Sequence, residues 1–102
     1  MNIPQIQLFK HCRILVAGDC FIDQYINGDV ERMSPEAPIP IVRSRDIKDQ
    51  LGGAGNVVNN IQSLQGYAKI LTCFGKDPYG NILNELLKKT GANTDFIFRI
   101  SE

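Results

Sequence analysis

Short apolar runs alternate along the chain with apolar residues at helical spacing. Residues 13–17 form an apolar run that stops at a glycine, as a buried strand does when it ends at a turn. The runs at 68–74 and 95–100 predict two further strands. One helix is predicted after the glycine turn at 52–55, and another after Asp77–Pro78, an N-cap followed by proline. This alternation predicts right-handed crossovers and a parallel sheet.

Each predicted helix is expected to bury one apolar face. Gly66 is the expected C-terminal stop of the first helix. The apolar positions of the two helices are Val57, Val58, Ile61 and Leu64 in the first, and Ile82, Leu83, Leu86 and Leu87 in the second.

The segment 24–48 has a different character, with one glycine and three prolines. Because proline cannot donate to a β-ladder, Pro38 and Pro40 favour edge strands or lid strands. Two helices barely cover both faces of a parallel sheet, and the chain stops directly after the last predicted strand. We therefore expect residues 1–102 to be part of a larger α/β domain, with a small β-lid at about 24–48.

Composition narrows the classes of function. The 102 residues are 43% hydrophobic, which is ordinary for a chain that buries a core. Eleven basic residues balance eleven acidic ones, so no global field favours nucleic acid or an acidic membrane. The sequence has neither an apolar run near the ~20 residues of a membrane span nor a secretory signal, so we expect a cytoplasmic protein.

The cysteines point to no metal or disulfide chemistry. Three cysteines without a C-x-x-C pair, and a single histidine, fit neither a zinc site nor a disulfide framework. We expect reduced thiols that pack as small apolar groups.

The first candidate for chemistry is an acidic pair, Gly18-Asp19-x-x-x-Asp23, directly after the first strand. Ligands of open α/β sheets bind outside the carboxyl ends of the strands. Carboxylates there can accept charge-assisted hydrogen bonds from sugar hydroxyls. The same spacing also fits a turn cap at Asp19 and a solvated Asp23.

The second candidate is Gly52-Gly53-Ala54-Gly55-Asn56. Glycines let the backbone approach a ligand closely, and the Asn56 amide can both donate to and accept from a hydroxyl. A simple tight turn between strand and helix is the alternative. A dinucleotide fingerprint would need glycine where Val58 lies, and no Walker loop is present.

Taken in order, these motifs resemble the ribokinase (PfkB) family of carbohydrate kinases, most closely its bacterial heptose-7-phosphate kinases. The resemblance extends from about residue 10 onward, and the Ser-Pro-Glu-Ala-Pro block distinguishes the subfamily. Gln65 and Val58 depart from the family pattern, which favours glycine and a small residue there. The matching segments are 18–23, 28–30, 34–42, 52–56 and Gly75-x-Asp77-x-x-Gly80.

The resemblance implies the N-terminal part of a ribokinase-like three-layer α/β/α sandwich with a β-lid. It implies transfer of phosphate from ATP, with Mg²⁺, to the anomeric hydroxyl of D-glycero-β-D-manno-heptose 7-phosphate, on the route to ADP-heptose and the lipopolysaccharide core. A homodimer formed through the lid is expected, with no nucleic-acid or membrane partner. The alternatives are another sugar or nucleoside as substrate, or a non-catalytic remnant that associates through its lid.

By motif position, Asp23 is expected to bind sugar hydroxyls, with Asp19 near it. The resemblance also places three residues of the glycine motif, Gly52, Gly53 and Asn56, in the same pocket. Arg32 or Arg43 would meet the 7-phosphate, because a guanidinium suits phosphate bidentately, or would simply be a solvated lid charge.

No catalytic or metal-binding residue is expected within this chain. The resemblance places the catalytic base and the ATP site downstream of residue 102. Because phosphoryl transfer depends on those parts, we expect the chain alone to be inactive.

Overall fold

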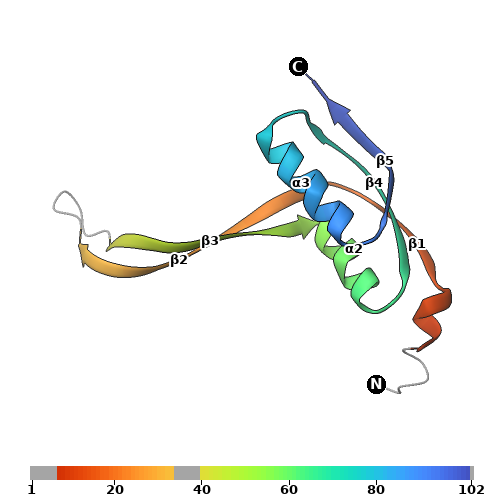
Figure 1. The fold of residues 1–102 in the computed structure, drawn as a ribbon, viewed down its shortest axis with the longest axis horizontal. Coiled ribbons are helices and arrows are strands. Elements are labelled where there is room, and N and C mark those ends of the chain that lie inside the picture. Colours follow the sequence, from red (N-terminus) through yellow and green to blue (C-terminus); the bar gives the residue numbers. More distant parts are fainter. Residues whose placement is uncertain (1–6, 34–39, 102) are drawn as a thin grey trace.

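The computed structural model describes residues 7–33 and 40–101, with side chains described for 7–26 and 47–101. The order of strand, hairpin, helix, strand, helix and strand agrees with the predicted order (Figure 1). The elements are the 3₁₀ helix η1 (Leu8–His11), β1 (Arg13–Ala17), β2 (Cys20–Met33), β3 (Pro40–Gly53), α2 (Ala54–Ser63), β4 (Tyr67–Gly75), α3 (Pro78–Lys89) and β5 (Asn93–Ile100).

Three strands form a parallel sheet in the order β1-β4-β5, which confirms the predicted sheet. Each crossover carries one helix, and both helices lie on the same side of the sheet (Figure 1). Right-handed crossovers that advance in one direction along a sheet place their helices on one face. In the described residues the fold therefore has two layers.

The core is small and lies between the sheet and its helices. Val58 of α2, Ala68 and Ile70 of β4, and Leu87 of α3 are fully buried, and Leu83 of α3 is nearly so. The opposite face of the sheet is apolar but uncovered among the described residues. Its exposed apolar side chains include Leu15, Leu71, Phe96 and Phe98.

The predicted helix faces were partly wrong. Val57 is 46% exposed and Leu64 is 41% exposed, although both belong to the apolar stripe of α2. Ile82 of α3 is likewise 38% exposed. Each helix contacts the sheet along a narrow line, so only the residues nearest that line are buried. Apolar spacing gave the helices correctly but overestimated the width of the buried stripe.

Helix α2 ends in a left-handed residue that is not glycine. Gln65 has φ +67°, and its amide donates to the Gln62 carbonyl at 3.0 Å. The Gly66 amide donates to the Ile61 carbonyl at 3.0 Å, which completes a Schellman motif. The expected stop at Gly66 was therefore one residue late. The left-handed position is the one at which the family pattern favours glycine.

Glycine at position 65 is expected to stabilise the chain. An L-residue in the left-handed region costs about 1–2 kcal/mol, part of which is offset by the greater freedom of glycine in the unfolded chain. We expect Gln65→Gly to raise the free energy of unfolding by about 0.5–1 kcal/mol, seen as a higher urea midpoint. Gln65→Ala should leave the midpoint nearly unchanged, and a lower midpoint for the glycine variant would contradict the assignment.

The start of α3 confirms its predicted cap. The Gly80 amide donates to Asp77 Oδ1 at 2.7 Å, and Pro78 occupies the first helical position. This cap fixes the turn that follows the carboxyl end of β4.

The antiparallel hairpin of β2 and β3 projects from the sheet (Figure 1). Its register shifts between Asn27 and Gly28 and between Val30 and Arg32. The projection gives a radius of gyration of 18.1 Å, against about 13 Å for a compact chain of this length. Pro40 begins β3, whereas Pro38 lies outside the described residues. The described parts of the expected lid segment 24–48, residues 24–33 and 40–48, belong to the two longer strands of this hairpin.

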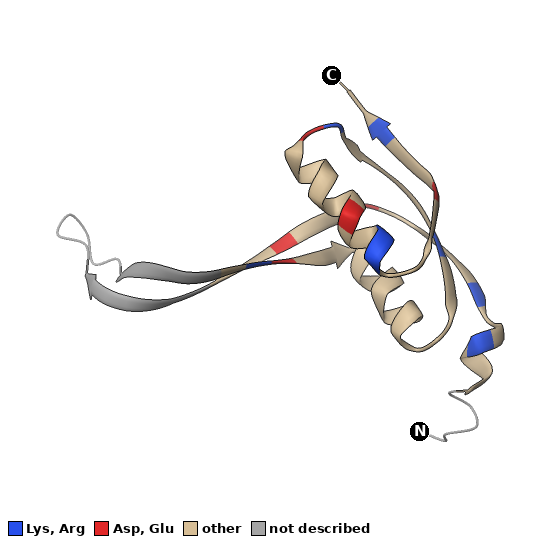
Figure 2. Ribbon diagram, in the orientation of Figure 1, with Lys and Arg blue, Asp and Glu red and all other residues tan. Residues whose placement is uncertain are grey.

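No helix in the described ranges is long and apolar enough to cross a bilayer. Acidic and basic residues are scattered over the elements and do not gather into a basic stripe in the described part (Figure 2).

Candidate functional site

The candidate site lies at the base of the hairpin, where β2 leaves the sheet and β3 returns to start α2. In the antiparallel register Cys20 is opposite Gly53, and Phe21 is opposite Gly52. Asp23 is opposite Gln50. Because directly opposed residues project to the same face of a hairpin, one face carries Phe21 and Asp23 together with Gln50 and Gly52.

Gly52 and Gly53 are the last two residues of β3 and do not form the expected free turn. Gly53 has φ +61°, which leads the chain directly into α2. The Ala54 amide donates to the Asp19 carbonyl at 2.9 Å, which ties the start of the helix to the start of the hairpin. A Cβ on Gly53 would collide with that same Asp19 carbonyl. The backbone therefore requires glycine at this position, whatever the ligand.

The space above both glycines is occupied by the Phe21 ring. A Cβ on Gly52 would lie 2.5 Å from Cδ2 of Phe21 and 2.9 Å from Oδ2 of Asp23. A Cβ on Gly53 would lie 2.7 Å from Cε1 of Phe21. We expected the glycines to leave room for a ligand, but in this structure they accommodate an aromatic ring. Sequence reasoning missed Phe21, and its only signal is a spacing of two residues from Asp23.

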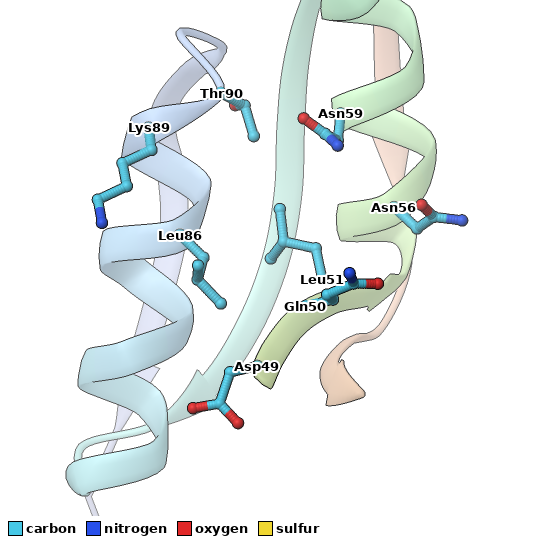
Figure 3. Close-up of a pocket in the computed structure, with 8 residues that line it drawn as sticks. All are labelled: Asp49, Gln50, Leu51, Asn56, Asn59, Leu86, Lys89 and Thr90. Atoms are coloured by element: carbon cyan, nitrogen blue, oxygen red, sulfur yellow. The ribbon is translucent and has the colours of Figure 1, made fainter. Parts of the chain in front are cut away.

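Asn56 lies in the first turn of α2, next to Gln50. Figure 3 shows the amides of Asn56 and Gln50 on the same side of the chain, away from Lys89 and Leu86. Gln50 is paired with Asp23, so this carboxylate and the Gln50 amide belong to one face of the hairpin base. Gln50 was also missed, because its position opposite Asp23 depends on a register that the sequence did not give.

A pocket lies beside Asp23 and shares two residues with the candidate site. Asp49, which accepts a hydrogen bond from Nε2 of Gln24 at 3.0 Å, lines it together with Leu51. The pocket has a volume of about 340 Å³ and lies between β3, α2 and α3 (Figure 3). Its lining also includes Gln50 and Asn56, but neither Asp23 nor Gly52. In the described part, Asp23 thus lies outside this pocket, whereas the two amides belong to its lining.

The remaining predicted site residues are Asp19, Arg32 and Arg43. The Asp19 side chain is exposed, and the residue contributes its backbone carbonyl to the junction. Arg32 is opposite Ile41, and Arg43 is opposite Asp29, in the outer half of the hairpin. The side chains of both arginines lie outside the described residues. The structure brings Asp23, Gly52 and Asn56 to one region and does not test the arginines.

Cys20 is the one group near the site with a displaced pKa. Burial raises the pKa of the Cys20 thiol, and the nearby Asp19 carboxylate adds to the rise. The neighbouring Thr72 hydroxyl and Gly55 backbone lower this pKa, but by less. Cys20 is therefore a neutral thiol at physiological pH. The three cysteines are free, and the described residues contain no group of three or more metal-binding side chains.

The chain has a parallel sheet, an inserted hairpin, and glycines and a carboxylate at the base of that hairpin. These features place it among the α/β proteins that carry a β-hairpin beside the sheet. A sequence model described as pfkB family carbohydrate kinase matches residues 13–102, and the chain belongs to this family.

Curated relatives agree with this family. The chain is 52% identical over 75 residues to a protein named bifunctional protein HldE from Rhodospirillum rubrum, covering 74% of this chain and 15% of that protein. It is 36% identical over 97 residues to a D-beta-D-heptose 7-phosphate kinase from Bordetella bronchiseptica, covering 95% of this chain and 31% of that protein. The chain thus spans less than a third of these relatives.

Solved structures agree with the fold. The chain matches a fructokinase from Xylella fastidiosa at a TM-score of 0.64 and 26% identity, over 87% of this chain and 26% of that one. It matches a putative ribokinase from Agrobacterium tumefaciens at a TM-score of 0.70 and 17% identity, over 86% of this chain and 28% of that one. The predicted ribokinase-like fold is confirmed.

Proposed function

We propose that this chain forms the sugar-binding part of an ATP-dependent kinase that phosphorylates the anomeric hydroxyl of D-glycero-β-D-manno-heptose 7-phosphate. The observation that carries the proposal is the pairing of Asp23 with Gln50 across the hairpin base, with the Asn56 amide on the same side of the chain as the Gln50 amide (Figure 3). The Asp23 carboxylate can accept hydrogen bonds from two neighbouring hydroxyls, and each amide can donate one and accept another. Such a set suits a polyol better than an apolar or a purely anionic ligand.

The choice of heptose is supported by the Bordetella bronchiseptica relative, whose name prints it, at 36% identity over 97 residues. In this proposal Arg32 or Arg43 contacts the 7-phosphate from the lid, and Asp19 lies at the margin of the sugar. The reaction would feed ADP-heptose and lipopolysaccharide core synthesis in the cytoplasm. Two copies would associate through their lids.

ATP and Mg²⁺ are proposed to bind to residues outside this chain. One solved relative is a fructokinase with bound ATP, and the chain covers only 26% of it. The described residues contain no cluster of three metal-binding side chains, so no Mg²⁺ site is proposed among them. The purified chain is therefore expected to show no ATP-dependent turnover with heptose 7-phosphate. Measurable turnover would contradict the proposal that ATP and Mg²⁺ bind to residues outside this chain.

The proposal is tested by grafting residues 13–102 into the Bordetella bronchiseptica kinase in place of its matching segment. The graft is expected to phosphorylate heptose 7-phosphate in preference to fructose 6-phosphate and ribose. Turnover of ribose or fructose 6-phosphate alone would favour a kinase for another sugar. An inactive graft, together with a purified chain that binds none of the three sugars, would favour a remnant that serves only association.

A further inference from the structure

Phe21 is an aromatic side chain held in an unusual place. It lies at the second position of β2, with its ring against consecutive glycines of β3. We propose that the outer face of this ring is a platform on which the sugar ring stacks, which makes Phe21 a specificity-determining residue of the polyol site. The inference rests on the proposed function and adds a residue to that site.

The ring lies against both Gly52 and Gly53. One pair of ring carbons, Cδ2 and Cε2, lies over Gly52, and the opposite pair, Cδ1 and Cε1, lies over Gly53. A side chain at either glycine would collide with the ring. The absence of side chains at both glycines therefore makes room for the Phe21 ring and limits where it can lie.

Half of the Phe21 surface is open. The residue remains 51% exposed, and it belongs neither to the buried core cluster nor to the partly buried residues packed against that cluster. Away from the glycines it lines a pocket of about 330 Å³ together with Phe74, Asp77 and Tyr79. A large apolar ring that is half exposed can still gain free energy by burying its open surface against a ligand.

The platform lies directly beside the carboxylate. A single point above Gly52 is 2.5 Å from Cδ2 of Phe21 and 2.9 Å from Oδ2 of Asp23, so the ring edge and the carboxylate are neighbours. A sugar has an apolar face of C–H groups and a rim of hydroxyls. With its rim on Asp23, Gln50 and Asn56, its C–H face would lie on the ring, whose negative π-face attracts the positive edge of C–H groups.

This geometry also predicts selectivity. A sugar that carries an axial hydroxyl on the stacked face would desolvate that hydroxyl against carbon, with no partner to replace water. Sugars with a continuous C–H patch on that face are therefore preferred. Asp23 alone does not impose this choice, because a carboxylate accepts from hydroxyls of either configuration.

The test titrates the purified chain with heptose 7-phosphate and follows NMR signals, with selective labelling of its five phenylalanines. We expect nuclear Overhauser contacts from Phe21 ring protons to sugar C–H protons. Phe21→Leu should raise Kd about five- to tenfold, the range expected from losing one aromatic contact, whereas Phe21→Tyr should change it less than about twofold. Phe98→Leu, at a 57% exposed phenylalanine of β5, is the matched control and should bind unchanged.

Unchanged or tighter binding by Phe21→Leu, or no contacts from the Phe21 ring, would overturn the platform. Tighter binding by Phe21→Ala would instead show that the ring blocks the glycines. If Phe21→Leu altered the spectrum beyond the site, its Kd would not be used. The presence or absence of nuclear Overhauser contacts between the Phe21 ring and the sugar in the unmodified chain would then decide whether the platform exists. Asp23→Asn separates the two proposals: if it weakens binding while Phe21→Leu does not, only the platform fails, and if the chain binds no sugar, both fail.

Discussion

Alanine at position 53 is expected to unfold the junction between the hairpin and α2. The left-handed φ of +61° costs an L-residue about 1–2 kcal/mol, and the collision of the new Cβ with the Asp19 carbonyl adds about 1–3 kcal/mol. The five buried apolar residues found among the described side chains form a small core, which leaves little stability to absorb a loss of this size. We expect Gly53→Ala to lose the dispersed amide spectrum of the folded chain.

Gly91→Ala is the matched control for this prediction. Gly91 also has positive φ, +81°, but a Cβ there would meet only Nε2 of Gln62 at 3.4 Å. Alanine at 91 should therefore carry the dihedral cost alone and leave the spectrum dispersed. Equal effects of the two substitutions would show that contact with Asp19 contributes nothing.

The second large effect is expected at Asp23. Asparagine keeps the shape of the side chain but removes the charge and one acceptor, and a hydrogen bond to a charged group contributes about 1.5–3 kcal/mol. We expect Asp23→Asn to raise Kd for heptose 7-phosphate by about ten- to a hundredfold, measured by titration calorimetry or NMR.

Asp49→Asn is the control for Asp23. Asp49 lies near Asp23 on the adjacent strand but belongs to the opposite hairpin face, where it accepts from Gln24. The same loss of charge at 49 should leave sugar affinity within about twofold if the effect at 23 is direct and not a long-range field. Similar losses at both positions would remove the special role of Asp23.

Much of the fold was predictable because its signals are local. The strand at 13–17 has the predicted bounds, and the Asp77 cap was visible as an aspartate followed by proline. The end of α2 was missed by one residue because Gln65 adopts a conformation that its side chain disfavours. The spacing of apolar residues does not mark such a residue, since the Schellman hydrogen bonds that hold it form only once the helix exists.

The residues of the candidate site were likewise predicted only in part. Asp23 and the glycines were found from motif spacing. Gln50 and Phe21 were missed because their positions depend on the pairing of two strands whose register no local pattern gives. The role of the glycines was also misjudged. Their lack of a side chain is used by the Phe21 ring in this structure, and a glycine pair does not reveal which group will occupy the space above it.

The most direct test of the account is to locate bound sugar on the chain. Amide shifts should be recorded while heptose 7-phosphate is added to the ¹⁵N-labelled protein. The account predicts that the largest shifts fall at residues 19–23 and 50–56. Shifts that instead concentrate at residues 74–77 and 100–101, which line a separate pocket at the ends of β4 and β5, would contradict it.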